Sequence, residues 1–176
     1  PMWLAGYGGR DRPAEGTNSR LWAKVLALQD ADGRRAVLVT FDLIGMERSL
    51  SQSLCARLEQ KFGLRRDQVA LCFSHTHSGP VVGRNLHPVH FDRLPAEAQA
   101  QIHSYADRLV ERVDGAVGEA LGALAPARLS EGAGLATFGV NRRLNREGEV
   151  PKRRAAGQLL GPVDPEVPVL AVRTPS

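Results

Sequence analysis

The sequence contains few cysteines and few aromatic residues, and it has no long hydrophobic run. Its 176 residues include 2 cysteines, and neither Cys55 nor Cys72 belongs to a C-x-x-C pair of the kind found in zinc or redox sites. We expect both to be buried free thiols. No apolar segment approaches the ~20 residues that a membrane-spanning helix needs, so no transmembrane segment is expected. No signal peptide is recognisable, but the sequence begins with Pro1, and localisation stays open, with secreted and periplasmic locations both compatible.

The charge is moderate and positive, with a formal net charge of +4 and a sequence pI of 9.6. Aromatic residues, which stack on bases, make up 5% of the chain, and no nucleic-acid-binding module is recognisable. We therefore expect no nucleic-acid partner. One basic stretch is interpreted as a solvated loop, with phosphate contact as its alternative; it contains Arg142, Arg143, Arg146, Lys152, Arg153 and Arg154.

A pair of histidines follows a short apolar run. Residues 69–73 (VALCF) predict a buried strand, and the segment SHTHSGP comes directly after it. Because side chains alternate along a strand, His75 and His77 are expected to point the same way and to converge on one point. A metal or catalytic site would suit this position, since open α/β sheets bind ligands at the carboxyl ends of their strands. Taken alone the pair is a weak motif, and two hydrogen-bonding histidines in a turn are its alternative.

The segments before the histidines predict a hairpin and a βαβ unit. Residues 21–29 and 35–43 are strand candidates joined by the turn signal Asp32-Gly33, and the second is apolar enough to be covered on both faces. A helix is expected over residues 48–62, ended by Gly63, before the strand at 69–73. The predicted fold is α/β: a mixed β-sheet with a βαβ unit preceded by a β-hairpin, covered by helices.

Asp42, at a strand end, either orients a metal-bound histidine or caps the following turn, and capping is the commoner use.

The second half of the chain predicts one long helix and further strands. The helix runs from Pro95 to about residue 124. Two short strand candidates separated by residues 132–134 follow, and residues 167–172 form another, with Pro168 at an edge or preceding the pairing. In the loop before the helix, His87 and His90 are interpreted as solvated side chains rather than ligands, with substrate contact as the alternative. His103 is expected to be a surface or packing residue.

Five segments, in order, carry a resemblance to a known family: LAGYGGR, LVTFDLIG, CFSHTHSGPVVG, FGVNRRLN and GPVDPEVPVLAV. Together they resemble the neutral/alkaline non-lysosomal ceramidases, amidase-type zinc hydrolases that cleave the N-acyl bond of ceramide. The resemblance implies that residues 1–176 form a single domain, the N-terminal portion of a larger catalytic domain. It also implies a zinc cofactor and, as substrate, a lipid or small molecule with an N-acyl bond. The oligomeric state stays open.

The same resemblance assigns roles to individual residues. His75 matches a zinc ligand, His77 matches a catalytic residue beside the substrate, and the LAGYGGR segment is expected near the cleft. Arg142 inherits a contact with the substrate or the transition state, although Arg143 fits the match equally well and a surface arginine is the alternative. The family's other zinc ligands (a histidine, a glutamate and a tyrosine) and its active-site serine are expected beyond Ser176, so this segment alone should bind metal weakly and turn over no substrate. The alternative function is a non-catalytic domain that keeps the fold and binds a ligand or partner.

Overall fold

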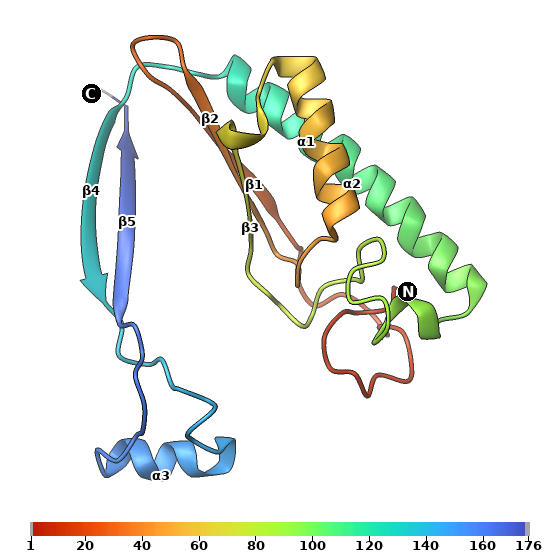
Figure 1. Ribbon diagram of the computed structural model, residues 1–176, viewed down its shortest axis with the longest axis vertical. Coiled ribbons are helices and arrows are strands. Elements are labelled where there is room, and N and C mark those ends of the chain that lie inside the picture. The colour runs from red at the N-terminus through yellow and green to blue at the C-terminus, as the bar shows by residue number, and fades with distance from the viewer. Residues whose placement is uncertain (1, 175–176) are drawn as a thin grey trace. The chain divides into compact units, whose positions relative to one another are not determined.

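The structure is a computed structural model that describes residues 2–174. The chain divides into two compact units, Pro1–Leu124 and Ala125–Ser176, which are described separately (Figure 1). The single domain expected over residues 1–176 stays a prediction.

The first unit begins with the expected hairpin. Strand β1 (Ala23–Gln29) pairs antiparallel with β2 (Arg35–Phe41). The turn is fixed by Asp30, whose Oδ1 accepts the backbone N–H groups of Asp32 (3.0 Å) and Arg34 (2.8 Å). Gly33 adopts a positive φ of 81°, which glycine tolerates without strain.

A βαβ unit follows, as predicted. Helix α1 (Arg48–Phe62) ends at Gly63, which takes a φ of 67° and donates its N–H to the Glu59 carbonyl at 2.8 Å. After a short 3₁₀ turn (Arg66–Gln68), strand β3 (Val69–Phe73) pairs parallel with β2, and the sheet has the order β1-β2-β3. The mixed α/β fold predicted from the sequence is confirmed.

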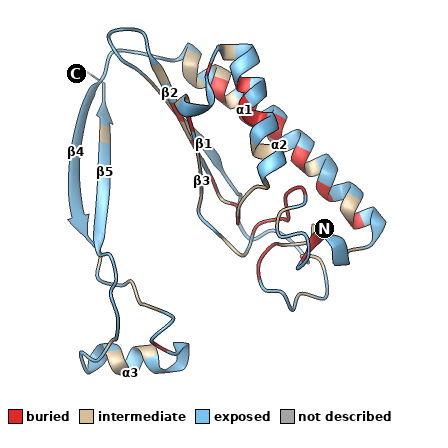
Figure 2. Ribbon diagram, in the orientation of Figure 1, coloured by how far each residue is buried: buried red, intermediate tan, exposed pale blue. Residues whose placement is uncertain are grey.

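Both long helices pack on the same side of this sheet. Helix α2 (Ala96–Gly122) contacts α1 and β1, and burial along β2 alternates, with Val37, Val39 and Phe41 buried (Figure 2). The expectation that β2 is covered on both faces is wrong, because in residues 2–174 both long helices lie on one face. The core contains Val37, Val39, Phe41, Leu43, Leu54, Cys55, Leu58, Leu64, Val69, Val82, Ala106, Val110, Val113 and Val117.

The two cysteines lie on opposite sides of this arrangement. Cys55 is buried on α1, where burial raises the pKa of its thiol. Cys72 is exposed on β3. Its neighbours along the strand, Leu71 and Phe73, pack against the core, so Cys72 occupies the opposite face of the sheet. The expectation of two buried thiols is therefore wrong for Cys72.

The second unit consists of a two-stranded ribbon and the segment that joins its strands. Strand β4 (Arg128–Leu135) pairs antiparallel with β5 (Glu166–Arg173), and a 3₁₀ turn (Glu147–Glu149) and helix α3 (Val150–Ala155) lie between them in sequence. The two short strands expected around residues 132–134 are one strand, because pairing with β5 continues through the glycines, with Ala133 opposite Pro168. No helix in the described part of the chain has the length and apolar character of a membrane span.

Candidate active site

The histidine segment lies at the carboxyl ends of the parallel strands β2 and β3. Past the end of β3, the N–H of Ser74 still donates to the Phe41 carbonyl and that of His75 to the Leu43 carbonyl, both at 3.0 Å. His75 has a φ of 58°, which is rare for a residue with a side chain, so its backbone departs from strand geometry. The rings of His75 and His77 nevertheless lie 5.2 Å apart. The two imidazoles therefore lie close together, as predicted, although the backbone of His75 itself is not that of a strand.

His75 has one ring nitrogen fixed by a hydrogen bond. Its Nδ1 lies 2.9 Å from the carbonyl oxygen of Ile44. A carbonyl only accepts hydrogen bonds, so in the neutral imidazole Nδ1 carries the proton and Nε2 has a free lone pair. Metal-binding histidines are commonly held in this way, with one nitrogen bonded to a carbonyl and the other facing the metal.

The donor set fits a zinc ion only in part. A catalytic zinc takes about three protein ligands. Within residues 2–174, no group of three or more His, Cys, Asp or Glu side chains is placed to hold a metal ion. His75 therefore has the chemistry of one such ligand.

Asp42 has neither of the uses predicted for it. Its Oδ2 accepts the backbone N–H of Trp22 at 2.9 Å, and its own N–H donates to the Trp22 carbonyl at 2.9 Å. It thus closes the open end of the hairpin. The carbonyl of Ile44, rather than Asp42, orients His75.

His77 packs against the glycine-rich N-terminal loop. A Cβ atom built on Gly6 would lie 2.3 Å from Cγ of His77, so the Gly6 backbone rests directly on the imidazole. The Tyr7 ring meets the His77 ring edge to face at 4.7 Å, and Nη2 of Arg10 donates to the His77 carbonyl at 2.6 Å. The loop thus places the Tyr7 ring against the His77 ring and the Arg10 guanidinium on the His77 carbonyl.

A small core holds this loop beside the histidines. The N–H of Ala5 donates to the Gly79 carbonyl and that of Val81 to the Trp3 carbonyl, both at 2.9 Å. The buried residues of this core come from the N-terminal loop, the segment after β2, the loop after the histidines, and α2: Ala5, Ile44, Val81, Phe91 and Ile102. Four separate chain segments are thereby fixed around His75 and His77.

His90 is buried, contrary to the expectation of a solvated side chain. It is 8% exposed, and its Nε2 accepts the N–H of Gly6 at 3.1 Å. Burial, and then the positive charges of Arg10 and Arg93 and the neighbouring His77, lower the pKa of His90 below the ordinary 6.5. Sequence reasoning missed this contact because the partners are 84 positions apart.

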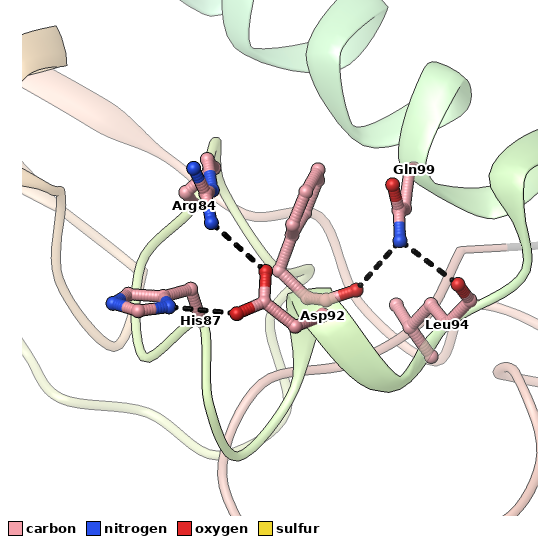
Figure 3. A network of polar contacts seen from close by, with 6 residues as sticks. Arg84, His87, Asp92, Leu94 and Gln99 are labelled. Atoms are coloured by element: carbon pink, nitrogen blue, oxygen red, sulfur yellow. Dashed lines mark hydrogen bonds and ion pairs between the residues drawn. The ribbon is translucent and has the colours of Figure 1, made fainter.

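The loop that carries His90 is also more ordered than expected. Asp92 accepts from Nδ1 of His87 at 2.8 Å and from Nη2 of Arg84 at 3.0 Å, and Nε2 of Gln99 donates to the Leu94 carbonyl at 2.9 Å (Figure 3). The hydrogen bond from His87 lowers the pKa of Asp92 below its usual value. Burial alone would raise this pKa, but the bonds from His87 and Arg84 together outweigh it. His87 itself is exposed, as expected.

A cavity of about 1080 Å³ lies on the other side of the histidine segment. Ser74, Thr76 and Ser78, which alternate with the histidines, line it, together with Asp42 and Tyr105. Neither His75 nor His77 is part of its wall. The segment therefore presents hydroxyl groups to one side and imidazoles to the other.

Arg142 belongs to the second unit. Its Nη2 forms an ion pair with Oε2 of Glu147 at 2.8 Å, and the side chain is exposed. Arg143 is exposed too, and its backbone N–H donates to Oδ1 of Asn141 at 3.2 Å. The substrate contact assigned to Arg142, or equally to Arg143, stays a prediction.

Comparison with known proteins identifies similar sequences and structures. Neutral ceramidase of Pseudomonas aeruginosa is 34% identical over 80 residues, covering 44% of this chain and 12% of that protein. Neutral ceramidase of Drosophila melanogaster is 29% identical over 77 residues, covering 43% of this chain and 11% of that protein.

Solved structures of such enzymes share the fold. Neutral ceramidase from Pseudomonas aeruginosa matches 97% of this chain with a TM-score of 0.70 and 24% identity, and a ceramidase complexed with C2 matches the same share with a TM-score of 0.72 and 24% identity. This chain covers 26% of each of those chains.

A family model described as neutral/alkaline non-lysosomal ceramidase, N-terminal, matches residues 2–170. The match includes both units and every segment that carried the resemblance in the sequence, except the last two residues of the fifth. This chain therefore belongs to the neutral/alkaline non-lysosomal ceramidase family and corresponds to its N-terminal part.

Proposed function

We propose that this chain carries part of the active site of a zinc-dependent amide hydrolase that cleaves the N-acyl bond of ceramide or of a smaller amide. The observation that carries the proposal is the fixed tautomer of His75 beside a second imidazole: Nδ1 is bonded to the Ile44 carbonyl, and the His77 ring lies 5.2 Å away. Family membership supports the same reaction class, and the names of the relatives support ceramide as the substrate.

In this proposal His75 is one zinc ligand through Nε2. When bound, the metal supplies Lewis acidity at the amide carbonyl and lowers the pKa of a bound water toward neutrality. The Ile44 carbonyl keeps the proton on Nδ1, so Nε2 meets the metal without first losing a proton. The remaining ligands come from the longer protein.

His77 acts beside His75 as a proton carrier. A neutral imidazole accepts a proton and an imidazolium returns it, which amide hydrolysis requires when the amine leaves. Its position is fixed by the Gly6 backbone against its ring and by Arg10 on its carbonyl.

Arg142 is assigned to the polar head group of the substrate or to the developing oxyanion. A planar guanidinium suits this role, and Arg142 would leave its ion pair with Glu147 to bind the substrate.

The proposal is tested by zinc analysis of the full-length protein. We expect about one zinc per chain in the wild type and a sharp loss in His75→Ala. The matched control is His87→Ala, an exposed histidine from the adjoining loop, which should retain its zinc. Zinc retained by His75→Ala would reject the ligand assignment.

Hydrolysis of N-acylsphingosine and of short N-acyl amides by the same variants tests the reaction. His77→Ala should keep zinc and lose turnover by a factor on the order of 10² to 10⁴. A wild-type protein with neither zinc nor hydrolysis would instead favour the non-catalytic domain that binds a ligand or partner.

A further inference from the structure

We propose that His90 is a positioning residue, which holds the Gly6–Tyr7 backbone against His77 and thereby sets the orientation of the His77 imidazole. The kinetic part of this inference rests on the proposed function, whereas the structural part stands on the contacts alone.

Both backbone polar groups of Gly6 are bonded to side chains. The N–H donates to Nε2 of His90 at 3.1 Å, and the carbonyl accepts from Nε of Arg10 at 3.2 Å. Arg10 also donates to the His77 carbonyl at 2.6 Å. A continuous chain of hydrogen bonds therefore runs from His90 through Gly6 and Arg10 to His77.

The backbone that His90 holds touches the His77 ring directly. No side chain fits at Gly6, where a Cβ would lie 2.3 Å from Cγ of His77, and the φ of Gly6 is 79°. Tyr7, the next residue, also has a positive φ of 52°, although it carries a side chain. Glycine adopts a positive φ readily, but Tyr7 carries a side chain and needs outside contacts to stay there. The bond that the Gly6 N–H donates to His90 fixes the backbone immediately before Tyr7.

His90 is itself firmly held. It is 8% exposed, it precedes the 3₁₀ turn Phe91–Arg93, and its N–H donates to the Leu86 carbonyl at 3.0 Å. Phe91 belongs to the small core that also contains Ala5, the residue before Gly6. Both ends of the His90–Gly6 bond are thus attached to the same packed cluster.

His90 works as an acceptor only while it is neutral. The groups around it disfavour its protonation: burial acts first, followed by the charges of Arg10, Arg93 and His77, and together they lower its pKa. Asp11 is the acidic residue that shares a small cavity with His90, Arg10 and Arg93. The lowered pKa therefore favours the neutral form of His90, which accepts the bond from Gly6.

Three substitutions at His90 in the full-length protein separate positioning from packing. In His90→Gln the side-chain amide reaches about as far as Nε2 and accepts from Gly6. In His90→Asn the amide reaches only as far as Nδ1, and in His90→Phe the ring fills the space without an acceptor. The matched control is His87→Phe, an exposed histidine of the same loop.

Two measurements are made on each variant: hydrogen exchange of the peptide that contains Gly6, and kcat for N-acyl hydrolysis. In His90→Asn and His90→Phe we expect the Gly6 peptide to lose protection from hydrogen exchange and kcat to fall on the order of tenfold to a hundredfold. Small misplacements of reacting groups reduce the rate by such factors. Gln and the His87→Phe control should stay within about threefold of the wild type.

The outcomes are decisive in both directions. If His90→Asn and His90→Gln behave alike in hydrogen exchange or in kcat, the positioning role is wrong. This comparison can be made even if His90→Phe fails to fold. If exchange at Gly6 changes as expected but neither His90 nor His77 variants alter hydrolysis, the contact stands, and the catalytic role proposed for His77 is rejected together with the positioning role of His90. If His77→Ala abolishes turnover while His90→Asn leaves kcat unchanged, the positioning role alone is rejected.

Discussion

At the scale of single residues, the site depends on positions where the backbone takes unusual angles. Among the described residues with side chains, Tyr7, His75 and Leu86 have a positive φ. Tyr7 and His75 both lie beside His77, with ring separations of 4.7 Å and 5.2 Å. Strained residues of this kind persist where the surrounding contacts over-determine them, and they gather at functional sites. The Nδ1 of His75 also lies 2.9 Å from the Ile44 carbonyl oxygen.

Gly6→Ala should disturb His77 directly. The added methyl would meet the imidazole at 2.3 Å and would occupy a backbone with a φ of 79°, which costs a residue with a side chain about 1–2 kcal/mol. We expect kcat for N-acyl hydrolysis to fall on the order of tenfold to a hundredfold. The unfolding free energy should fall as well, by about the 1–2 kcal/mol of the backbone conformation.

Gly9→Ala is the matched control, because a Cβ at Gly9 meets nothing within 4 Å. Equal activity of the two variants in a steady-state assay of the full-length protein would show that the loop does not restrain His77.

The sequence revealed the residues of the site unevenly, and distance along the chain is the reason. His75 and His77 were visible because they lie two positions apart after a recognisable strand. The bond from Gly6 to His90 spans 84 positions and leaves no local pattern, so His90 was taken for a solvated side chain. Asp42 was placed correctly at a strand end, but its partner, Trp22, lies across the hairpin.

At the scale of helices and strands, one buried carboxylate ties α1 to α2. Asp114 on α2 is 2% exposed, and its Oδ2 accepts from Nζ of Lys61 at 2.6 Å and from Nε of Arg57 at 3.1 Å. Within the described residues its Oδ1 has no hydrogen-bond partner. Burial by itself raises the pKa of Asp114, but the bonds from Lys61 and then Arg57 outweigh it and lower the pKa below 3.8.

Asp114→Asn should loosen the packing of the two helices. The substitution keeps the shape and an acceptor oxygen but removes the charge opposite Lys61 and Arg57, and we expect the unfolding free energy to fall by about 1.5–3 kcal/mol, the typical contribution of hydrogen bonds to charged groups. The pKa of Asp114 is lower in the folded protein than in the unfolded chain, where it is 3.8. Its contribution to the free energy of unfolding is therefore complete above pH 3.8 and is lost as the pH falls through the pKa of the folded protein.

Urea unfolding at neutral pH and at a pH near 3 checks both expectations. The difference in unfolding free energy between wild type and Asp114→Asn should be large at neutral pH and should shrink at acid pH. Asp107→Asn, an exposed position on the same helix, is the control and should differ little from the wild type at either pH. A difference that grows on acidification would contradict the assignment of the charge.

The boundaries of elements were predictable where local chemistry marks them. Gly63 ended α1 at the expected residue, and Asp32-Gly33 marked the hairpin turn. The glycines at 132–134 gave a misleading break in β4, because strand pairing bonds the backbone regardless of side chain. The covering of β2 was misjudged for a related reason: an apolar run shows that a strand can be buried, not which face the helices occupy.

At the scale of the whole molecule, burial is distributed very unevenly between the two units. The core between α1, α2 and the sheet contains fourteen buried residues, all from the first unit. In the described part of the second unit, Asn145 is the one buried residue. Its Nδ2 donates to the carbonyls of Asn141 and Leu160, and its Oδ1 accepts the Leu160 N–H. Polar bonds, rather than an apolar core, organise that segment.

This contrast predicts two levels of backbone protection in the 176-residue chain. A two-stranded ribbon without a buried face is marginally stable in water, so the amides of β4 and β5 should exchange within about tenfold of an unstructured peptide. The amides of β2, between two strands and under both helices, should exchange at least about a thousandfold more slowly, since opening them requires unfolding the core. Hydrogen exchange followed by mass spectrometry distinguishes the two levels. If β4 and β5 were protected to the same degree as β2 in this chain, the ribbon would have to be covered, and its stability would come from burial rather than from its own pairing.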